Sequence, residues 1–288
     1  MASTSIISGG ASTPRQSYRV DQGRTIWIRQ GRSGSPEDVL LANFSARVIE
    51  EIHVEDGRGT QVYFRVEAVL DGEARVVCLS AAQFRDMRWV EEYLGAGAIV
   101  ESGYGFRDHL RAAFLHFSGD RRITSEYRHV GWREIDGQAV YLTASGGIGA
   151  DGARPDVHVV PPPALHHLIL PCSESEEAAR AAVLASLELR QLGPARLLHP
   201  LLATVRRSIL GDADFSAALI GKSGEFKTAV AVVMQQHFGS GFNERQVPGS
   251  AESTANALEE SLHQAKDMLF VIDDIAPQAN SDAARAQH

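Results

Sequence analysis

The sequence predicts an α+β domain followed by part of an α/β domain. In the first half, Leu40–Val54 and Gln61–Leu70 alternate apolar and polar residues, which is typical of antiparallel strands with one buried face. In the second half, an apolar run over Phe215–Gly221 leads through a glycine-containing loop into a helical pattern that extends to Phe238. Another apolar run, Met268–Ile272, ends in a pair of aspartates. Strands that alternate with helices in this way indicate a parallel sheet.

The composition indicates a soluble globular protein of ordinary make-up. The 288 residues are 44% hydrophobic and 22% charged, and they suffice for two domains. The formal net charge of −8 argues against a surface that binds nucleic acid throughout, although it leaves room for a local basic groove. No apolar run approaches the roughly 20 residues that span a bilayer. Because the N-terminus also lacks the apolar core of a signal peptide, we expect a cytoplasmic protein with no membrane partner.

The first half carries the patterns of an α+β domain, which we expect to span residues 18–150. Ser80 precedes apolar residues at helical spacing, so a helix is expected to begin there. Arg107–Ser118 has apolar residues three and four positions apart, as on one face of a helix. Arg128–Thr143 is typical of a second hairpin. Residues 1–17 are small and polar without periodicity, and we expect them to be disordered.

A glycine- and proline-rich stretch over 146–163 separates the two halves. We place the domain boundary at about 150–165 and expect 151–170 to be a linker. The following residues, 174–192, have the pattern of an amphipathic helix. Residues 171–288 are then expected to form the partial α/β domain.

The loop that follows Phe215–Gly221 fits the pattern of a phosphate-binding loop, G-x-x-x-x-G-K-[ST]. Gly221 stands at its first position, and Lys227 and Thr228 close it where the helix is expected to start. Consecutive backbone N–H groups at a helix N-terminus attract phosphate. We therefore predict that the loop binds the phosphates of ATP or GTP, with ATP as the expected cofactor. Its residues are Gly221, Lys222, Ser223, Gly224, Glu225, Phe226, Lys227 and Thr228.

A second register of the same pattern fits less well. Closing the loop at Gly221–Ser223 would require glycine at position 216, where the chain has Ser216, and no helical pattern follows directly. The preferred register has one departure, because Phe226 stands where the general pattern has glycine. A Cβ and ring would crowd the loop unless the ring points away, and we expect Gly224 to supply the backbone freedom.

The residue types assign roles within this site. Lys227 is expected to reach the β- and γ-phosphates as a catalytic cation, and Thr228 to hold Mg²⁺ through its hydroxyl. Lysine is rare in this chain, where arginine supplies most of the 28 basic residues, so a lysine here indicates a need for a compact ammonium. Asp273 is expected at the carboxyl end of a parallel strand, as a Mg²⁺ ligand. Asp274 is expected as a catalytic residue near the attacking water, although it is one methylene shorter than the usual glutamate.

With these motifs placed, the chain resembles the bacterial domain-of-unknown-function 927 family, which contains P-loop ATPase-like proteins of plasmids, phages and integrative elements. The resemblance spans about Tyr18 to Pro277, and the Phe-Lys-Thr ending of the loop is similar to a variant in that family. It is carried by LANFSARVIEEI (41–52), RDHLRAAF (107–114), YRHVGWREIDG–VYL (127–142), GGIGADG (146–152), GKSGEFKT (221–228), HFGSGFN (237–243), GSAESTANALE (249–259) and KDMLFVIDDIAP (266–277). The resemblance implies a RecA/AAA-like P-loop NTPase core and a helicase-like or primase-associated ATPase (a hydrolase) in DNA replication of mobile elements.

The resemblance also implies a departure after the aspartates. Members of the family continue with further strands, a polar sensor residue and an arginine finger from a neighbouring subunit, whereas only the polar Gln278–His288 follows here. We therefore expect a truncated or split ATPase that binds nucleotide with little turnover. Its implied partners are DNA and a homo-oligomer or a completing downstream chain. The alternative is a non-enzymatic remnant or DNA- or partner-binding accessory module, in which the loop is an ordinary turn and the aspartates are merely solvated.

Overall fold

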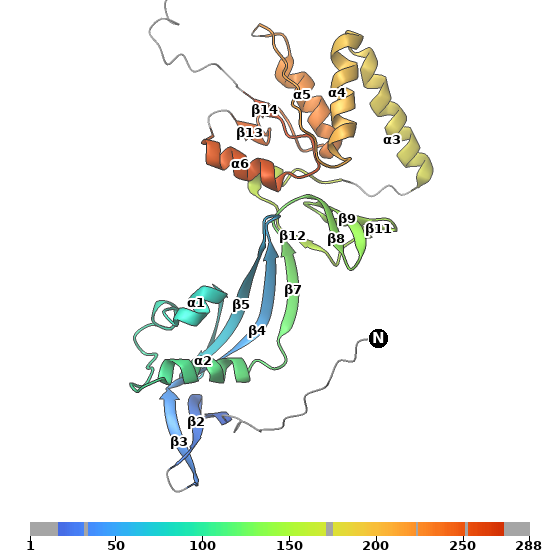
Figure 1. Ribbon diagram of the computed structural model, residues 1–288. Coiled ribbons are helices and arrows are strands. Elements are labelled where there is room, and N and C mark those ends of the chain that lie inside the picture. Colours follow the sequence, from blue (N-terminus) through green and yellow to red (C-terminus); the bar gives the residue numbers. More distant parts are fainter. Residues whose placement is uncertain (1–16, 32–33, 171–174, 223, 251–252, 274–288) are drawn as a thin grey trace, which may run out of the picture. The chain divides into compact units, whose positions relative to one another are not determined.

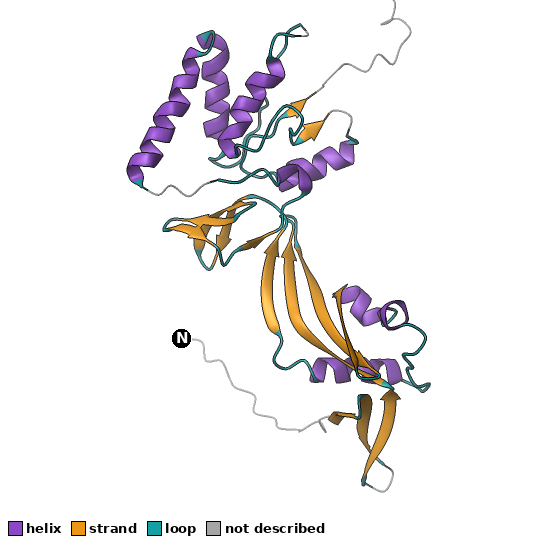
Figure 2. Cartoon of the chain, turned by 180° about the vertical axis from the view of Figure 1, so that it is seen from behind, coloured by secondary structure: helices purple, strands orange, loops and turns teal. Residues whose placement is uncertain are grey.

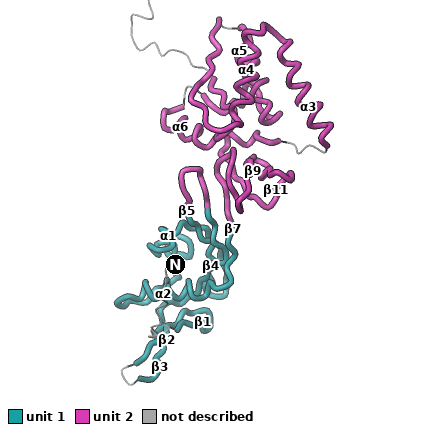
Figure 3. Tube along the Cα trace, turned by 45° about the vertical axis from the view of Figure 1, so that its right-hand side comes forward, with its two compact units in different colours: residues 1–53, 61–124 teal, residues 54–60, 125–288 magenta. Residues whose placement is uncertain are grey.

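The computed structural model describes residues 17–31, 34–170, 175–222, 224–250 and 253–273 (Figure 1). The chain divides into two compact units: unit 1 contains residues 1–53 and 61–124, and unit 2 contains residues 54–60 and 125–288 (Figure 3). The predicted disordered segment 1–17 lies outside the described residues, apart from Ser17, which begins a strand.

Unit 1 contains a three-stranded antiparallel sheet and most of a larger second sheet. Its strands are β1 (Ser17–Asp21), β2 (Arg24–Gln30), β3 (Pro36–Ala42), β4 (Phe44–Glu55), β5 (Thr60–Leu70), β6 (Glu73–Ser80) and the start of β7 (Arg122–Tyr127). One sheet has the order β1-β2-β3, and the other contains β7-β4-β5-β6 in that order. The alternation of residues that predicted β4 and β5 is confirmed. The predicted Leu40–Val54 strand is interrupted at Asn43, whose side chain bonds the backbone of Gly97 and Ile99.

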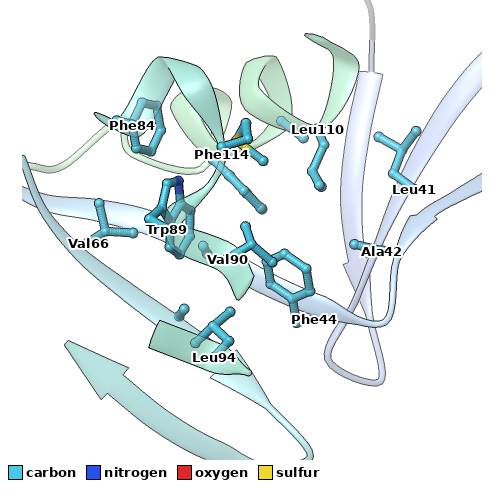
Figure 4. Packing of buried hydrophobic residues seen from close by; sticks show 14 of the residues in the cluster. Leu41, Ala42, Phe44, Val66, Phe84, Trp89, Val90, Leu94, Leu110 and Phe114 are labelled. Atoms are coloured by element: carbon cyan, nitrogen blue, oxygen red, sulfur yellow. The ribbon is translucent and has the colours of Figure 1, made fainter. Parts of the chain in front are cut away.

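Helices cover the sheet of unit 1 and complete its core. They are α1 (Ala81–Asp86), the π-helix η1 (Val90–Leu94) and α2 (Phe106–His116). Ser80 caps α1 in a capping box with Gln83, as the sequence predicts for a helix that begins there. Figure 4 shows Trp89, Phe44 and Phe114 meeting in the centre of this core, where each is almost completely buried.

Unit 2 begins with a small antiparallel sheet of order β11-β10-β9-β8. Its strands are β8 (Gly131–Ile135), β9 (Gln138–Thr143), β10 (Gly146–Gly149) and β11 (Gly152–Arg154). The pairing of β8 with β9 confirms the predicted hairpin. The short β12 (His158–Val159) lies parallel to the end of β7, and the 3-10 helix η2 (Pro163–Leu165) follows. The expected linker 151–170 is therefore folded.

The division into units does not coincide with the predicted boundary at about 150–165. The reason is that residues just after 125 belong to the core and hydrogen-bond network of unit 2. Val130 is fully buried in a cluster with Phe242. Trp132 Nε1 donates to the Ile209 carbonyl at 2.8 Å, and the Tyr141 hydroxyl donates to the Asp267 carbonyl at 2.9 Å.

The remainder of unit 2 is mainly helical. Its elements are α3 (Glu176–Glu188), η3 (Leu189–Gln191), α4 (Ala195–Ser208), α5 (Lys227–Gln235), η4 (Gln236–Phe238), β13 (Gly249–Ser250), α6 (Ala255–Gln264) and β14 (Ile272–Asp273). The helix predicted over 174–192 is confirmed by α3 and η3. Across the described ranges, no helix has the length and apolar character needed to cross a membrane.

The strand predicted over Phe215–Gly221 is wrong, since these residues are described and form no strand. A strand needs a hydrogen-bonded neighbour, and here Phe215 is 55% exposed and Ile220 94% exposed. The strand predicted over Met268–Ile272 is confirmed only at its end, where β14 pairs in parallel with β13 (Figure 2). Met268 is buried, but it belongs to the apolar cluster rather than to a strand.

Candidate functional site

Two described residues of the loop before α5 have a left-handed backbone conformation. Helix α5 begins at Lys227, one residue before the predicted start (Figure 1). Its N-cap, Phe226, has φ 56° and ψ 25°, and Gly224 has φ 82°, so both lie in the left-handed region. Position 226 therefore adopts the conformation that the glycine of the general pattern favours. The Phe226 ring is 78% exposed, so the expected crowding of the loop does not occur.

The ammonium of Lys227 lies against the opening residues of the loop. Nζ donates to the carbonyl of Gly221 at 2.9 Å and to that of Lys222 at 2.6 Å. These bonds join the first residue of the helix to the first residues of the loop. The cation that the sequence assigns to phosphate is thus positioned at the loop itself.

Glu225 places a carboxylate inside the same loop. The backbone N–H of Lys222 donates to Oε2 of Glu225 at 2.9 Å. A Cβ built on Gly221 would lie 2.3 Å from that oxygen, so glycine at 221 leaves room for it. The sequence pattern assigns Glu225 no role of its own. The signal that could have indicated this contact is an acidic residue close to the backbone N–H groups of the loop.

Thr228 and Asp273 meet although 45 residues separate them in the chain. The Thr228 hydroxyl lies 3.2 Å from Oδ1 of Asp273. A hydroxyl and a carboxylate are the hard oxygen ligands that Mg²⁺ takes from a protein when phosphates supply the rest. The donor set therefore fits the predicted ion. Among the described residues, no group of three or more His, Cys, Asp and Glu side chains is placed to hold a metal, so the protein ligands here would need oxygens from the bound phosphates.

A buried glutamine connects the end of α5 to the segment that precedes Asp273. Gln235, at the end of α5, is fully buried; its Nε2 donates to the Leu269 carbonyl at 2.7 Å, and its Oε1 accepts from the Val271 N–H at 3.0 Å. The same helix carries Thr228 at its start, and the bonded segment leads into Asp273. Gln235 could not be identified from the sequence, because nothing in the pattern of a helix indicates that one glutamine bonds a backbone segment more than 30 residues away.

Two predicted site residues, Ser223 and Asp274, lie outside the described residues. The described members of the site are brought together as one group around the start of α5. They are accessible to a ligand, since Lys227 and Thr228 are half-buried and the other described residues of the loop are exposed.

Unit 1 offers a separate surface that bears on the alternative function. The carboxylate of Glu50 is nearly buried. It forms ion pairs with Arg122 Nη2 at 2.9 Å and with Arg65 Nε at 2.8 Å, and it accepts a hydrogen bond from the Thr124 hydroxyl at 3.1 Å. The hydrogen bonds from Arg122, more than the other contacts, lower the pKa of the Glu50 carboxyl. The neighbouring Arg121 is paired with a glutamate as well. These arginines already have carboxylate partners within the unit.

Comparison with known proteins identifies no relative, since neither a protein-family model nor a curated protein matches the chain.

Proposed function

We propose that the loop 221–228 binds the phosphates of a nucleoside triphosphate and that Thr228 and Asp273 hold the accompanying Mg²⁺. The observation that carries this proposal is the 3.2 Å contact between Thr228 and Asp273. It joins the closing residue of the loop to the first of the aspartates. A contact between a hydroxyl and a carboxylate can form without a Lys-Thr loop beside it. The binding of Mg²⁺–ATP, by contrast, uses the loop for the phosphates and the hydroxyl–carboxylate pair for the metal.

The backbone of the loop supports the same proposal. Phe226 is in the left-handed region directly before the first residue of α5, so the loop ends at the N-terminus of a helix. The backbone N–H groups and the dipole at a helix N-terminus together attract an anion.

The chemistry of the site would be phosphoryl transfer to water. Bound Mg²⁺ would supply charge stabilisation at the phosphates, Lys227 would add a second cation, and Asp274 is the proposed orienting group for water. An arginine supplied by a neighbouring subunit is worth about 10³–10⁵ in rate in related systems, so turnover by this chain alone is expected to be slow. We further propose ATP as the nucleotide, a RecA/AAA-like core, DNA and a homo-oligomer as partners, and a role in DNA replication of mobile elements.

A second candidate function is a partner-binding module without nucleotide. It is favoured by the finding that residues 215–221 do not form the strand that a phosphate-binding loop usually follows. In that interpretation the loop is inert, and unit 1 binds a partner. Unit 1 has a surface cavity of about 510 Å³ beside η1 and α2. The residues that line it include Val90 and the ion pair of Arg107 with Glu91, whose charged atoms are 3.7 Å apart. The two functions differ in whether a nucleotide binds at all.

Titration calorimetry of Mg²⁺–ATP on the wild-type chain and Lys227→Ala tests the proposal. We expect binding at about micromolar strength, near −8 kcal/mol, and its loss in the variant. Lys266→Ala is the matched control, because Lys266 is an exposed lysine of the same unit, away from the loop. Equal heats for all three folded chains, whether large or absent, would contradict nucleotide binding through Lys227.

A further inference from the structure

The carboxylate of Glu225 accepts a backbone N–H of the loop to which the proposed function assigns a phosphate. Oε2 of Glu225 accepts the Lys222 N–H at 2.9 Å, and the space beside it is open because residue 221 is glycine. Glu225 also stands two positions before the first residue of α5, where the helix dipole favours negative charge. A backbone N–H and a helix N-terminus are the same features that a bound phosphate uses.

A phosphate and this carboxylate therefore compete for one position. An incoming phosphate must displace Glu225 from the Lys222 amide, and its charge is repelled by the carboxylate while Glu225 remains nearby. Lys227 cannot cancel this repulsion fully, because its ammonium is shared with the carbonyls of Gly221 and Lys222. A ligand that brings its own cation meets less repulsion than a bare anion.

We infer that Glu225 is a specificity-determining residue that disfavours free anions and admits a polyphosphate together with its divalent cation. This inference rests on the proposed function of the loop. It adds that the loop discriminates between Mg²⁺–ATP and metal-free ATP or inorganic phosphate, and that it does so through one side chain.

The test compares the dissociation constants of ATP with Mg²⁺ and with EDTA for the wild-type chain and Glu225→Gln. Glutamine keeps the shape and an oxygen acceptor but removes the charge. We expect Glu225→Gln to strengthen metal-free ATP binding about tenfold and Mg²⁺–ATP binding only about threefold, because the cation already screens the ligand. Glu244→Gln removes an exposed charge from the same unit and should change either constant by less than about twofold.

The unequal gain is the decisive readout, since a purely structural role would change both constants alike. Unchanged or weaker ATP binding in Glu225→Gln, with wild-type binding intact and lost in Lys227→Ala, would overturn this inference and leave the proposed function standing. Binding by Glu225→Gln alone, with none by wild type in Mg²⁺, would overturn this inference, because the wild-type loop would then not admit Mg²⁺–ATP. No binding in wild type, Glu225→Gln or Glu225→Ala, all folded by circular dichroism, would overturn the proposed function and the inference together.

Discussion

Strand β4 of unit 1 and residues 215–220 of unit 2 are both rich in apolar side chains but differ in their surroundings. In β4, buried positions alternate with less buried ones, and Phe44 and Val48 enter a core that helices cover. In 215–220, Phe215 and Ile220 are exposed, and these residues form no strand. Apolar sequence becomes a strand in this chain where hydrogen-bonded neighbours and a covering layer receive it.

The same contrast separates what holds each region in place. The sheet of unit 1 is stabilised by packing of large side chains around Trp89. The loop region of unit 2 is positioned by polar contacts: the clamp from Gln235, the bonds from Lys227, and the Thr228–Asp273 pair. Substitutions in the two regions should therefore differ in size and in what they affect.

The largest expected effect is on the packed region. Trp89→Ala should lower the free energy of unfolding by about 3–5 kcal/mol, because Trp89 is 1% exposed and its removal leaves a cavity. Urea unfolding followed by circular dichroism measures this. Tyr104→Ala is the control, since Tyr104 is fully exposed. A loss no greater than that of the control would show that packing does not hold this unit.

Gln235→Met tests the polar clamp of the loop region. Methionine has a similar volume but leaves the Leu269 carbonyl and the Val271 amide without their partner, at a cost of about 1–3 kcal/mol. Thermal unfolding gives the stability change, and the affinity for Mg²⁺–ATP should weaken with it. Gln191→Met, at an exposed position of the same unit, serves as the control. If Gln235→Met binds Mg²⁺–ATP with the wild-type affinity, the hydrogen bonds of Gln235 do not position the candidate site.

Glu50→Gln tests the ionic part of unit 1 and has a defined pH dependence. The Arg122 hydrogen bonds lower the pKa of Glu50 in the folded state, so its contribution to stability is present above the unfolded pKa of about 4.3. That contribution is lost as the pH falls through the lowered folded pKa. We expect the variant to be less stable by about 1–2 kcal/mol at pH 7 and equal to wild type in strong acid, as measured by denaturant unfolding. A difference that persists unchanged in acid would contradict the assignment to charge.

The smallest expected effect is at Phe226. Glycine removes the left-handed strain of about 1–2 kcal/mol but adds about 0.5–1 kcal/mol of unfolded-state entropy, so Phe226→Gly should be neutral or slightly stabilising. Phe226→Ala keeps the Cβ and should not show this gain. Melting temperatures of the two variants compare them. A clear loss of stability in the glycine variant would show that the exposed ring makes a contact that matters.

Periodicity was enough to predict β4, β5 and the β8–β9 hairpin, because each follows from which residues face the core. It also predicted the helix at α3, although α3 has no buried residue in the structure. The cap at Ser80 follows from local chemistry in the same way. The strand over Phe215–Gly221 could not be judged from its own residues, since its formation depends on neighbours elsewhere in the chain.

The candidate site divides similarly. Spacing alone placed Lys227 and Thr228 at the start of a helix and paired them with Asp273. The left-handed conformation of Phe226 was indicated only by the general pattern, which has glycine at this position. The roles of Glu225 and Gln235 depend on side-chain directions in three dimensions, which no spacing rule supplies.

The central claim is that the loop and Asp273 form one site for a nucleotide and its metal. The most direct test is the Mg²⁺ dependence of ATP binding in the wild-type chain and in Asp273→Asn, which keeps the shape of the side chain. We expect Mg²⁺ to strengthen ATP binding at least about tenfold in wild type and to have almost no effect in the variant. An equal increase in both chains would show that Asp273 does not hold the metal and would contradict the claim.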